Sequence, residues 1–211
     1  MNPFSFFRAP CLLSAGSGLA ALLVAAPAAA VVQGSEGGPL AAASLMVLNS
    51  RGGVCTGLAL APDVVLTAGH CVAGGVEVRA HFREADGQPA LVLPKTIAIH
   101  PEYRAGAAEK RQRSVDLALL RLAEPLPGFA TAELSQAQPR IGAEITVTGH
   151  GAGLENDPRS MGTLRSANLA VIEPYGPSQI LLWAADPAGK GKTTGAGACH
   201  GDSGGAMVDA S

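Results

Sequence analysis

The sequence is poor in charged and aromatic residues. Only 15% of its 211 residues are charged and 4% are aromatic, whereas about a quarter of an average globular domain is charged. The net charge is −2, and no run of basic or acidic residues predicts a nucleic-acid surface or a charged interaction tail. Glycine (27) and proline (15) are plentiful instead. They favour many short strands joined by turns over a bundle of helices.

The N-terminal segment has the features of an export signal. An apolar stretch runs from Leu12 to Ala26, Pro27 ends it, and three small residues follow at positions 28–30. We expect a secretory signal peptide over residues 1–30, cleaved before Val31, because small residues are typical of the cleavage site. The alternative is an uncleaved membrane anchor, since the apolar stretch is close to spanning length. Cleavage predicts a secreted protein, extracellular or periplasmic, without stable membrane association.

The rest of the chain alternates short apolar segments with turn-forming residues. Segment 76–82 places an apolar residue at every second position, as in a half-buried strand. The candidate strands are Ser44–Leu48, Val54–Leu60, Val64–Thr67, Val76–Phe82, Leu91–His100, Leu117–Leu122, Glu144–Thr148, Leu164–Ile172, Ile180–Trp183 and Ala206–Val208. The proline-containing segment Ala123–Arg140 has the composition of a linker. About six candidate strands precede it and about four follow it, which fits two small antiparallel barrels, the second short of strands.

Export places the cysteines in an oxidising compartment. Once residues 1–30 are removed, three cysteines remain, at positions 55, 71 and 199. An odd number in a secreted chain leaves at least one thiol without an intramolecular partner. A bridge between Cys55 and Cys71 would close a short loop and contribute about 3 kcal/mol. Cys199 would then be left alone.

Three segments carry residues with catalytic potential. His70 lies in Thr67-Ala68-Gly69-His70-Cys71, Asp116 opens the apolar run at 116–120, and Ser203 lies in Gly201-Asp202-Ser203-Gly204-Gly205. A serine hydroxyl is a poor nucleophile until a base takes its proton. An imidazole titrates near neutrality and serves as that base. A buried carboxylate then holds the imidazole in the required tautomer.

These segments, in the order histidine, aspartate, serine, resemble those of the trypsin/chymotrypsin-type serine peptidases, of the secreted bacterial kind. The resemblance extends from Val31 to Gly205. It includes His100-Pro101-Glu102-Tyr103 and Thr148-Gly149-His150-Gly151, where the family has T-G-W-G and this chain has His150 in place of tryptophan. It implies an all-β fold of two antiparallel six-stranded barrels. We expect the first barrel in residues 31–130 and the second, incomplete, in 131–211.

The resemblance implies a role for each of these residues. His70 is the general base, Asp116 orients it and Ser203 is the nucleophile, in an endopeptidase that hydrolyses peptide bonds through an acyl-enzyme. The N–H groups of Gly201 and Ser203 form the oxyanion hole, since glycine allows the tight turn that aims them. Cys55 and Cys71 form the disulfide beside the histidine. Peptides or proteins are the implied substrates.

The resemblance also gives Val31 a role. Family members free an N-terminus of the type Ile/Val-Val-x-Gly, whose ammonium pairs with the aspartate before the serine. Val31-Val32-Gln33-Gly34 fits this pattern, and Asp202 is that aspartate. An α-amino group has a pKa of about 7.7–8 and is largely charged at neutral pH. We therefore expect signal cleavage alone to create the pair; the alternative is an ordinary strand start.

Specificity and cofactors are weakly encoded. The position that lies at the base of the family's primary substrate pocket is Gly197, so no carboxylate is available to bind Arg or Lys and we expect an uncharged substrate side chain. The histidines at 81, 100, 150 and 200 are scattered, and no cluster has metal-ligand spacing. We expect these histidines to be exposed or structural, and no metal or cofactor.

The end of the sequence raises an alternative from another functional class. The chain ends at Ser211, soon after Ser203, and the resemblance implies a downstream cysteine as partner for Cys199, a closing strand and a C-terminal helix. We therefore expect an open second barrel with exposed strand edges. Either this is a truncated form of a normal enzyme, or it is a catalytically silent or fragmentary homologue that acts as a binding protein. The intact triad favours the enzyme.

Overall fold

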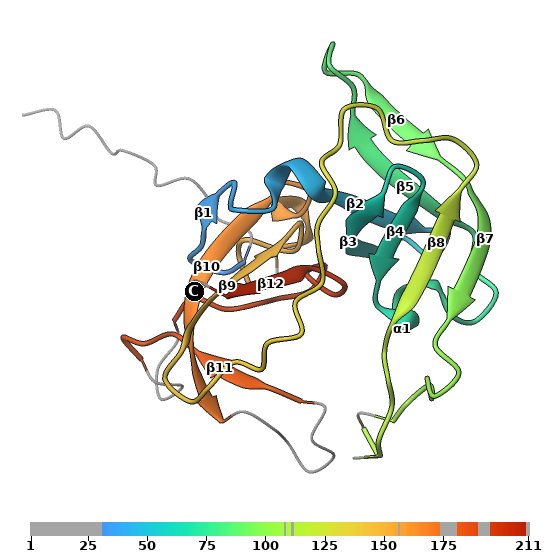
Figure 1. Cartoon of the computed structure of the whole chain (residues 1–211). Helices are drawn as coiled ribbons and strands as arrows, with labels where there is room; N and C mark the ends of the chain where they lie inside the picture. The colour runs from blue at the N-terminus through green and yellow to red at the C-terminus, as the bar shows by residue number, and fades with distance from the viewer. Residues whose placement is uncertain are drawn as a thin grey trace, which may run out of the picture.

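The computed structural model describes residues 31–107, 109–110, 112–155, 157–173, 181–189 and 195–209. The expected signal peptide lies outside the described residues. Two antiparallel sheets make up nearly all of the regular structure, and the helical elements within the described ranges are single turns (Figure 1). None of these described helices is long and apolar enough to cross a membrane.

The first sheet contains seven strands in the order β6-β5-β2-β3-β4-β8-β7. They are β2 (Ser44–Asn49), β3 (Val54–Ala61), β4 (Val64–Thr67), β5 (Val78–Arg83), β6 (Pro89–Val92), β7 (Pro94–Ile99) and β8 (Ala118–Leu122). The two edge strands, β6 and β7, are neighbours in the chain and only Leu93 separates them. Val92 pairs with Ala80 of β5, whereas Pro94 pairs with Leu122 of β8. The sheet must therefore curl until its two edges meet, which gives the barrel.

This barrel encloses the larger hydrophobic core. Alternate residues of β5 point inward, since Val78, Ala80 and Phe82 are all buried, as the two-residue period predicts. They pack with buried residues of the neighbouring strands, including Leu45 and Leu120. Burying a side chain of this size contributes roughly 1.5–3 kcal/mol relative to leaving it exposed. The alternation in the sequence therefore determines which face of the sheet becomes the core.

The second sheet contains five strands in the described residues, with the path β1-β10-β9-β12 and β11 paired to β10. They are β1 (Ser35–Glu36), β9 (Glu144–Gly149), β10 (Arg165–Glu173), β11 (Trp183–Ala185) and β12 (Ala206–Asp209). Among the described residues, its buried cluster consists of Ile145, Leu169 and Val171, with four partly buried apolar residues packed against it. The segment between β8 and β9 runs from one sheet to the other without regular structure, as expected of the linker (Figure 1).

The all-β prediction is confirmed, with local differences. The expected strand Leu91–His100 is two strands, because the chain changes partners at Leu93. β1 was not predicted, and it joins the second sheet although it precedes the first. The strand expected at Ile180–Trp183 begins at Trp183, and Ile180 lies outside the described residues. The expected six strands in each barrel are seven and five in the described part of the chain.

Hydrogen bonds through Thr56 of β3 join the two sheets. The Thr56 backbone N–H donates to the Ser203 carbonyl at 2.8 Å, and the Thr56 hydroxyl donates to the Gly201 carbonyl at 3.0 Å. The same hydroxyl accepts the backbone N–H of His150 at 2.9 Å. Thr56 is 1% exposed, so these bonds form away from water, where a lost partner is costly. They hold the segment around Ser203 against the first barrel.

Candidate active site

His70 and Asp116 are held together from two sides. His70 lies in α1 (Gly69–Val72), a single helical turn after β4, and Asp116 lies just before β8. His70 Nδ1 is 2.6 Å from Asp116 Oδ2, and the His70 backbone N–H donates to Asp116 Oδ1 at 2.8 Å. A side-chain carbon at Gly69 would lie 3.1 Å from Asp116 Oδ1 and 3.1 Å from Tyr103 Cδ2. Glycine at this position therefore gives the carboxylate room to approach the helix.

The Asp116 carboxylate is not buried, contrary to expectation. Its side chain is 43% exposed and that of His70 is 48% exposed. The reason is position, since Asp116 lies at the rim of the barrel and the buried part of β8 begins only at Ala118. An ion pair this exposed contributes little to stability, typically about 0–1 kcal/mol. The main effect of the His70–Asp116 pair is therefore to orient the imidazole, not to stabilise the fold.

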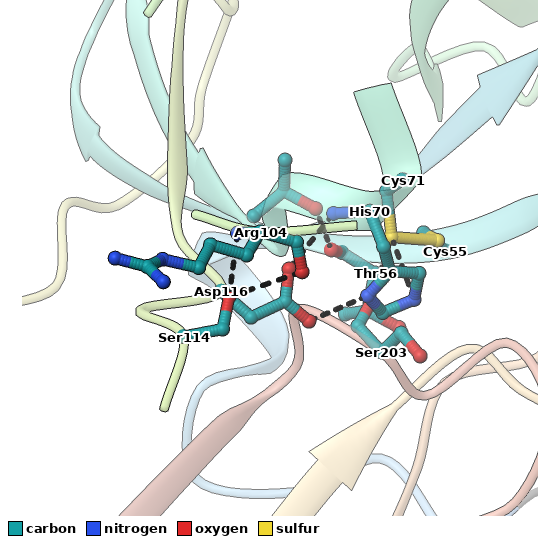
Figure 2. Close-up of polar contacts among 9 residues, drawn as sticks. Cys55, Thr56, His70, Cys71, Arg104, Ser114, Asp116 and Ser203 are labelled. Carbon is teal, nitrogen blue, oxygen red and sulfur yellow. Dashed lines mark hydrogen bonds and ion pairs between the residues drawn. A yellow bond between two sulfur atoms is a disulfide. The ribbon is translucent and has the colours of Figure 1, made fainter. Parts of the chain in front are cut away.

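Ser203 lies beside the His70 ring. Cys71 Sγ is 3.6 Å from His70 Nε2 and 3.9 Å from the Ser203 carbonyl oxygen. Figure 2 shows the Asp116 carboxylate turned toward the His70 ring, with Ser203 next to that ring. Within the described residues, Ser203 Oγ and His70 Nε2 are not joined by a hydrogen bond. Such contacts are often long in free enzymes and shorten when substrate binds.

The predicted disulfide is confirmed. Cys55 of β3 and Cys71 of α1 are joined by an S–S bond, with their Cα atoms 6.3 Å apart. The ligand atoms of Cys55, His70 and Cys71 lie within 4.8 Å of one another, but the two sulfur atoms are already bonded and cannot act as thiolate ligands. Cys199 is a free cysteine. The bridge therefore fixes the segment that holds His70 to the first barrel.

The loop around Ser203 requires its glycines. Gly201 and Gly204 have φ angles of +96° and +82°, in the region that favours glycine. A side-chain carbon at Gly204 would overlap the Thr56 carbonyl oxygen and Thr67 Oγ1. A side-chain carbon at Gly201 would lie 2.7 Å from the Gly151 Cα atom. The loop can therefore pack this closely against both sheets only without these side chains.

The expected oxyanion donors are free to bind a ligand. Among the described residues, the backbone N–H groups of Gly201 and Ser203 have no acceptor. The Thr56 hydroxyl, by contrast, holds the Gly201 carbonyl from the opposite side of the loop. Fixed and unpaired N–H groups are the donors that stabilise a developing negative charge.

Asp202 is buried beside Val31. Asp202 is 9% exposed and Val31 is fully buried, and both line a cavity of about 480 Å³. The Asp202 carboxylate accepts the backbone N–H groups of Gly151 and Cys199, both at 2.8 Å. Burial raises the pKa of Asp202 above its ordinary value, although these two hydrogen bonds oppose the shift. A cation next to this carboxylate would offset the cost of burying its charge.

Gly197 lines the same cavity. Its backbone N–H donates to the Val32 carbonyl at 3.2 Å, and a side-chain carbon built on it would meet no atom within 4 Å. The other lining residues are mostly apolar, and they include Leu169, Leu182 and Ala184. The only carboxylate among the described lining residues is that of Asp202, which already accepts two backbone hydrogen bonds.

Sequence reasoning missed Thr56 and the nearness of two histidines. Thr56 carries no motif, and its partners Gly201 and His150 are far away along the chain, so only the fold brings them together. His81 and His150 were expected to be scattered, but they line one cavity between the sheets. Burial lowers the pKa of both; for His81 the second cause is the positive charge of Arg83. Neither ring is simply exposed.

Comparisons with known proteins agree with this geometry. The Trypsin family profile matches residues 31–211. Human kallikrein-15 is 29% identical over 200 residues, covering 84% of this chain and 75% of the relative. Hypodermin-B of Hypoderma lineatum is 29% identical over 180 residues, covering 75% of this chain and 65% of the relative.

Among solved structures, the chain is similar to mouse neuropsin, a serine protease expressed in the limbic system of the brain. The TM-score is 0.66, the sequences are 22% identical, and the match covers 85% of this chain and 82% of neuropsin. At this identity the match shows the fold, which is chymotrypsin-like. The fold and the family relatives define a serine-type endopeptidase. The chain belongs to the Trypsin family.

Proposed function

We propose that this protein is a secreted serine endopeptidase that cleaves peptide bonds through His70, Asp116 and Ser203. The observation that carries the proposal is the doubly bonded pair of His70 and Asp116, which leaves His70 Nε2 directed to the side where Ser203 lies. When Nδ1–H donates to Asp116, Nε2 is the nitrogen with the free lone pair. That is the tautomer a general base needs.

Acylation begins at Ser203. Its Oγ attacks the substrate carbonyl carbon while its proton moves to His70 Nε2, and the resulting imidazolium is stabilised by Asp116. The carbonyl oxygen becomes an oxyanion, which accepts the N–H groups of Gly201 and Ser203. The C–N bond then breaks, and His70 gives its proton to the leaving amine. The product is an ester between Ser203 and the acyl part of the substrate.

Deacylation repeats these steps with water. His70 takes a proton from water, whose oxygen attacks the ester carbon, and the same two N–H groups stabilise the second oxyanion. The C–Oγ bond breaks and Ser203 regains its proton from His70. Atoms and charges balance without a metal or a redox cofactor, so the protein groups supply the whole chemistry.

Activation through the new N-terminus is part of the proposal. Removal of residues 1–30 would create an ammonium on Val31, and both Val31 and Asp202 line one cavity. Burial raises the pKa of Asp202, because desolvation disfavours its ionised form. An ammonium there would stabilise the carboxylate and, through it, the loop 201–205.

We further infer a preference for an uncharged side chain on the acyl side of the cleaved bond. Gly197 leaves space at the cavity of about 480 Å³, and the lining is mostly apolar. Asp202 is the one carboxylate among the described lining residues, and the proposed activation pairs it with the Val31 ammonium, so no carboxylate remains to pair with Arg or Lys. A peptide library digested by the protein should show cleavage after apolar residues. Strict cleavage after Arg or Lys would refute this preference.

The binding-protein alternative makes the opposite prediction for covalent chemistry. We expect the chain that begins at Val31 to release a burst of p-nitrophenol from an activated ester, with the acyl group found on Ser203 by mass spectrometry. Ser203→Ala should fold equally well and give no burst. A folded protein that gives no burst, but still binds peptides, would favour the silent homologue. Detection of the protein outside the cytoplasm, starting at Val31, would test secretion and processing.

A further inference from the structure

A second cavity, of about 680 Å³, lies between the two barrels. It is lined by Met46 and His81 of the first sheet, and by His150, Met161 and Gly162 of the segment between β9 and β10. None of these residues takes part in the chemistry proposed above. The cavity therefore brings two imidazoles and two thioethers together from four separate places in the chain.

Met46 and His81 point to the same side of the first sheet. Met46 of β2 is directly opposite His81 of β5 and, on its other side, directly opposite Thr56 of β3. Directly opposed residues of antiparallel strands project from the same face. Their neighbours Val47 and Ala80 are buried in the barrel core, so Met46 and His81 project toward the second sheet, in one row with Thr56.

The His150 ring can offer a lone pair, on Nε2, to a metal ion. Its Nδ1 is 3.3 Å from the Gly162 carbonyl oxygen, which can only accept, so the proton lies on Nδ1 and the lone pair on Nε2. Nε2 is shielded from solvent and makes no hydrogen bond of good geometry in the described chain, although the Ser44 backbone also interacts with the ring. His81 Nδ1 is likewise shielded and without a hydrogen bond. An imidazole that donates one N–H to a backbone carbonyl and leaves the other nitrogen free is the arrangement found in metal sites.

The two thioethers of the cavity come from β2 and from the residue before Gly162. A side-chain carbon at Gly162 would be 3.7 Å from Met46 Sδ. Met161 precedes Gly162 in the chain, and its Sδ would be 3.5 Å from a side-chain carbon at Gly201. Methionine has three rotatable bonds and adapts its sulfur position at low cost. Met46 and Met161 therefore line the same cavity as the His150 ring, with side chains that can adjust their sulfur positions.

We propose that Met46, His81, His150 and Met161 form a binding site for a soft monovalent metal ion, Cu(I) in chemical class. Thioether sulfur selects soft ions and imidazole binds copper well. No carboxylate or thiol occurs among the described residues that line the cavity, and the charged residue present there is Arg83. Without an anionic ligand, a single positive charge is easier to accommodate than the double charge of Zn²⁺.

The site would influence the nucleophile loop through Thr56. The His150 backbone N–H donates to Thr56 Oγ1, which in turn donates to the Gly201 carbonyl. A metal ion on His150 and Met46 would tie together the two residues that flank this connection. The binding itself does not depend on peptidase activity, so it can be tested in the Ser203→Ala protein.

The test uses Ag(I), a redox-stable probe for Cu(I), in chloride-free buffer. The free thiols are removed first by Cys11→Ser and Cys199→Ser, because thiolates bind Ag(I) strongly. The chain has four methionines, at positions 1, 46, 161 and 207, so a spectrum of ¹³C-methyl-labelled methionine has four signals. We expect one equivalent of Ag(I) to shift the signals of Met46 and Met161. Met207, 47% exposed on β12, is the internal control and should not move.

Variants distinguish this site from adventitious binding. Met46→Leu with Met161→Leu should weaken Ag(I) binding at least tenfold, and His150→Gln should do the same, whereas Met207→Leu and His100→Gln should have no effect. Leucine conserves volume, so the variants are expected to fold, and the methyl spectrum reports folding directly. The proposal is overturned if Ag(I) shifts neither Met46 nor Met161, or if the double variant binds Ag(I) as tightly as the parent.

Discussion

The two barrels differ in closure and in the size of their cores. In the first, the edge strands β6 and β7 are joined through Leu93 and a large cluster of side chains is buried. In the described part of the second, the buried cluster has three members, and large apolar side chains such as Trp183 and Ile172 are about half exposed. Yet the proposed nucleophile belongs to the second unit, and its base and orienting carboxylate belong to the first. The site therefore depends on the junction through Thr56.

The largest expected effect is a loss of activity when the His70–Asp116 pair of the first barrel is changed. Asp116→Asn should lower kcat by about 10⁴-fold, the effect known for this change in serine proteases, because the amide supports the wrong imidazole tautomer. The unfolding free energy should hardly change, since the pair is half exposed. Steady-state hydrolysis and urea unfolding measure the two quantities. Equal activity in the variant would remove Asp116 from the site.

A change in the loop should disable the site without unfolding the first barrel. Gly204→Ala places a carbon against the Thr56 carbonyl oxygen and Thr67 Oγ1, at a φ of +82°. The loop must move, and a displacement of about 1 Å at a catalytic centre can cost on the order of 10²-fold in rate. Peptidase assays combined with amide exchange of β2–β8 would check this. Full activity in Gly204→Ala would show that the loop position is not critical.

The cores of the two barrels should respond differently to the same leucine-to-alanine substitution. Leu120 and Leu169 are 0% and 5% exposed, in the first and second barrel respectively. Leucine-to-alanine changes in cores cost about 2–5 kcal/mol, and the cost depends on how far the surroundings collapse. We expect Leu120→Ala near the upper end and Leu169→Ala near the lower end, measured by urea unfolding. The reverse order of the two costs would contradict the contrast between the large core of the first barrel and the small core of the second.

Thr56→Val should loosen the junction. It leaves the Gly201 carbonyl and the His150 N–H without partners, at a cost of about 1–3 kcal/mol for buried groups. Because Gly201 supplies an oxyanion donor in the proposed mechanism, kcat should fall while KM changes little. Thr56→Ser keeps the hydroxyl and is the matched control, which should restore both values. Loss of stability in the serine variant as well would point to the methyl group instead.

The smallest effect expected is on the pH dependence of stability. In the chain that retains residues 1–30, burial raises the pKa of Asp202, so the unfolding free energy should fall as pH rises through that raised value. In the chain that begins at Val31, the ammonium should oppose this shift. Pairing raises the pKa of the amino group above its ordinary value of about 7.7–8, so the added stability should be lost only as pH rises above about 8. Urea unfolding of both chains from pH 4 to 9 measures the difference. Asp202→Asn should abolish it.

The sequence predicts local features better than contacts between segments that are far apart in the chain. Period-two alternation predicted the core-facing residues of β5, because it depends on neighbouring residues. The Cys55–Cys71 disulfide was implied by the family resemblance and is present in the fold. The change of partner at Leu93 and the pairing of β1 with β10 depend on tertiary closure, so the pattern did not contain them. Asp116 was expected to be buried because its chemical role suggested it, but its place at the barrel rim leaves it exposed.

The same limit applies to residues without a motif. Thr56 and Met46 look like ordinary strand residues in the sequence, and only the register across β2, β3 and β5 places them in a row with His81. The substitution of His150 for the family tryptophan was visible in the sequence. Its consequence was not, because the unpaired Nε2 is defined by what surrounds it in the fold.

The most direct test of the account is labelling with a fluorophosphonate, which reacts only with a serine activated by its base. We expect stoichiometric labelling of the chain that begins at Val31, located at Ser203 by peptide mass spectrometry, and a strong decrease in His70→Ala. The account is contradicted if the folded protein is not labelled, or if labelling at Ser203 is equally fast without the His70 imidazole.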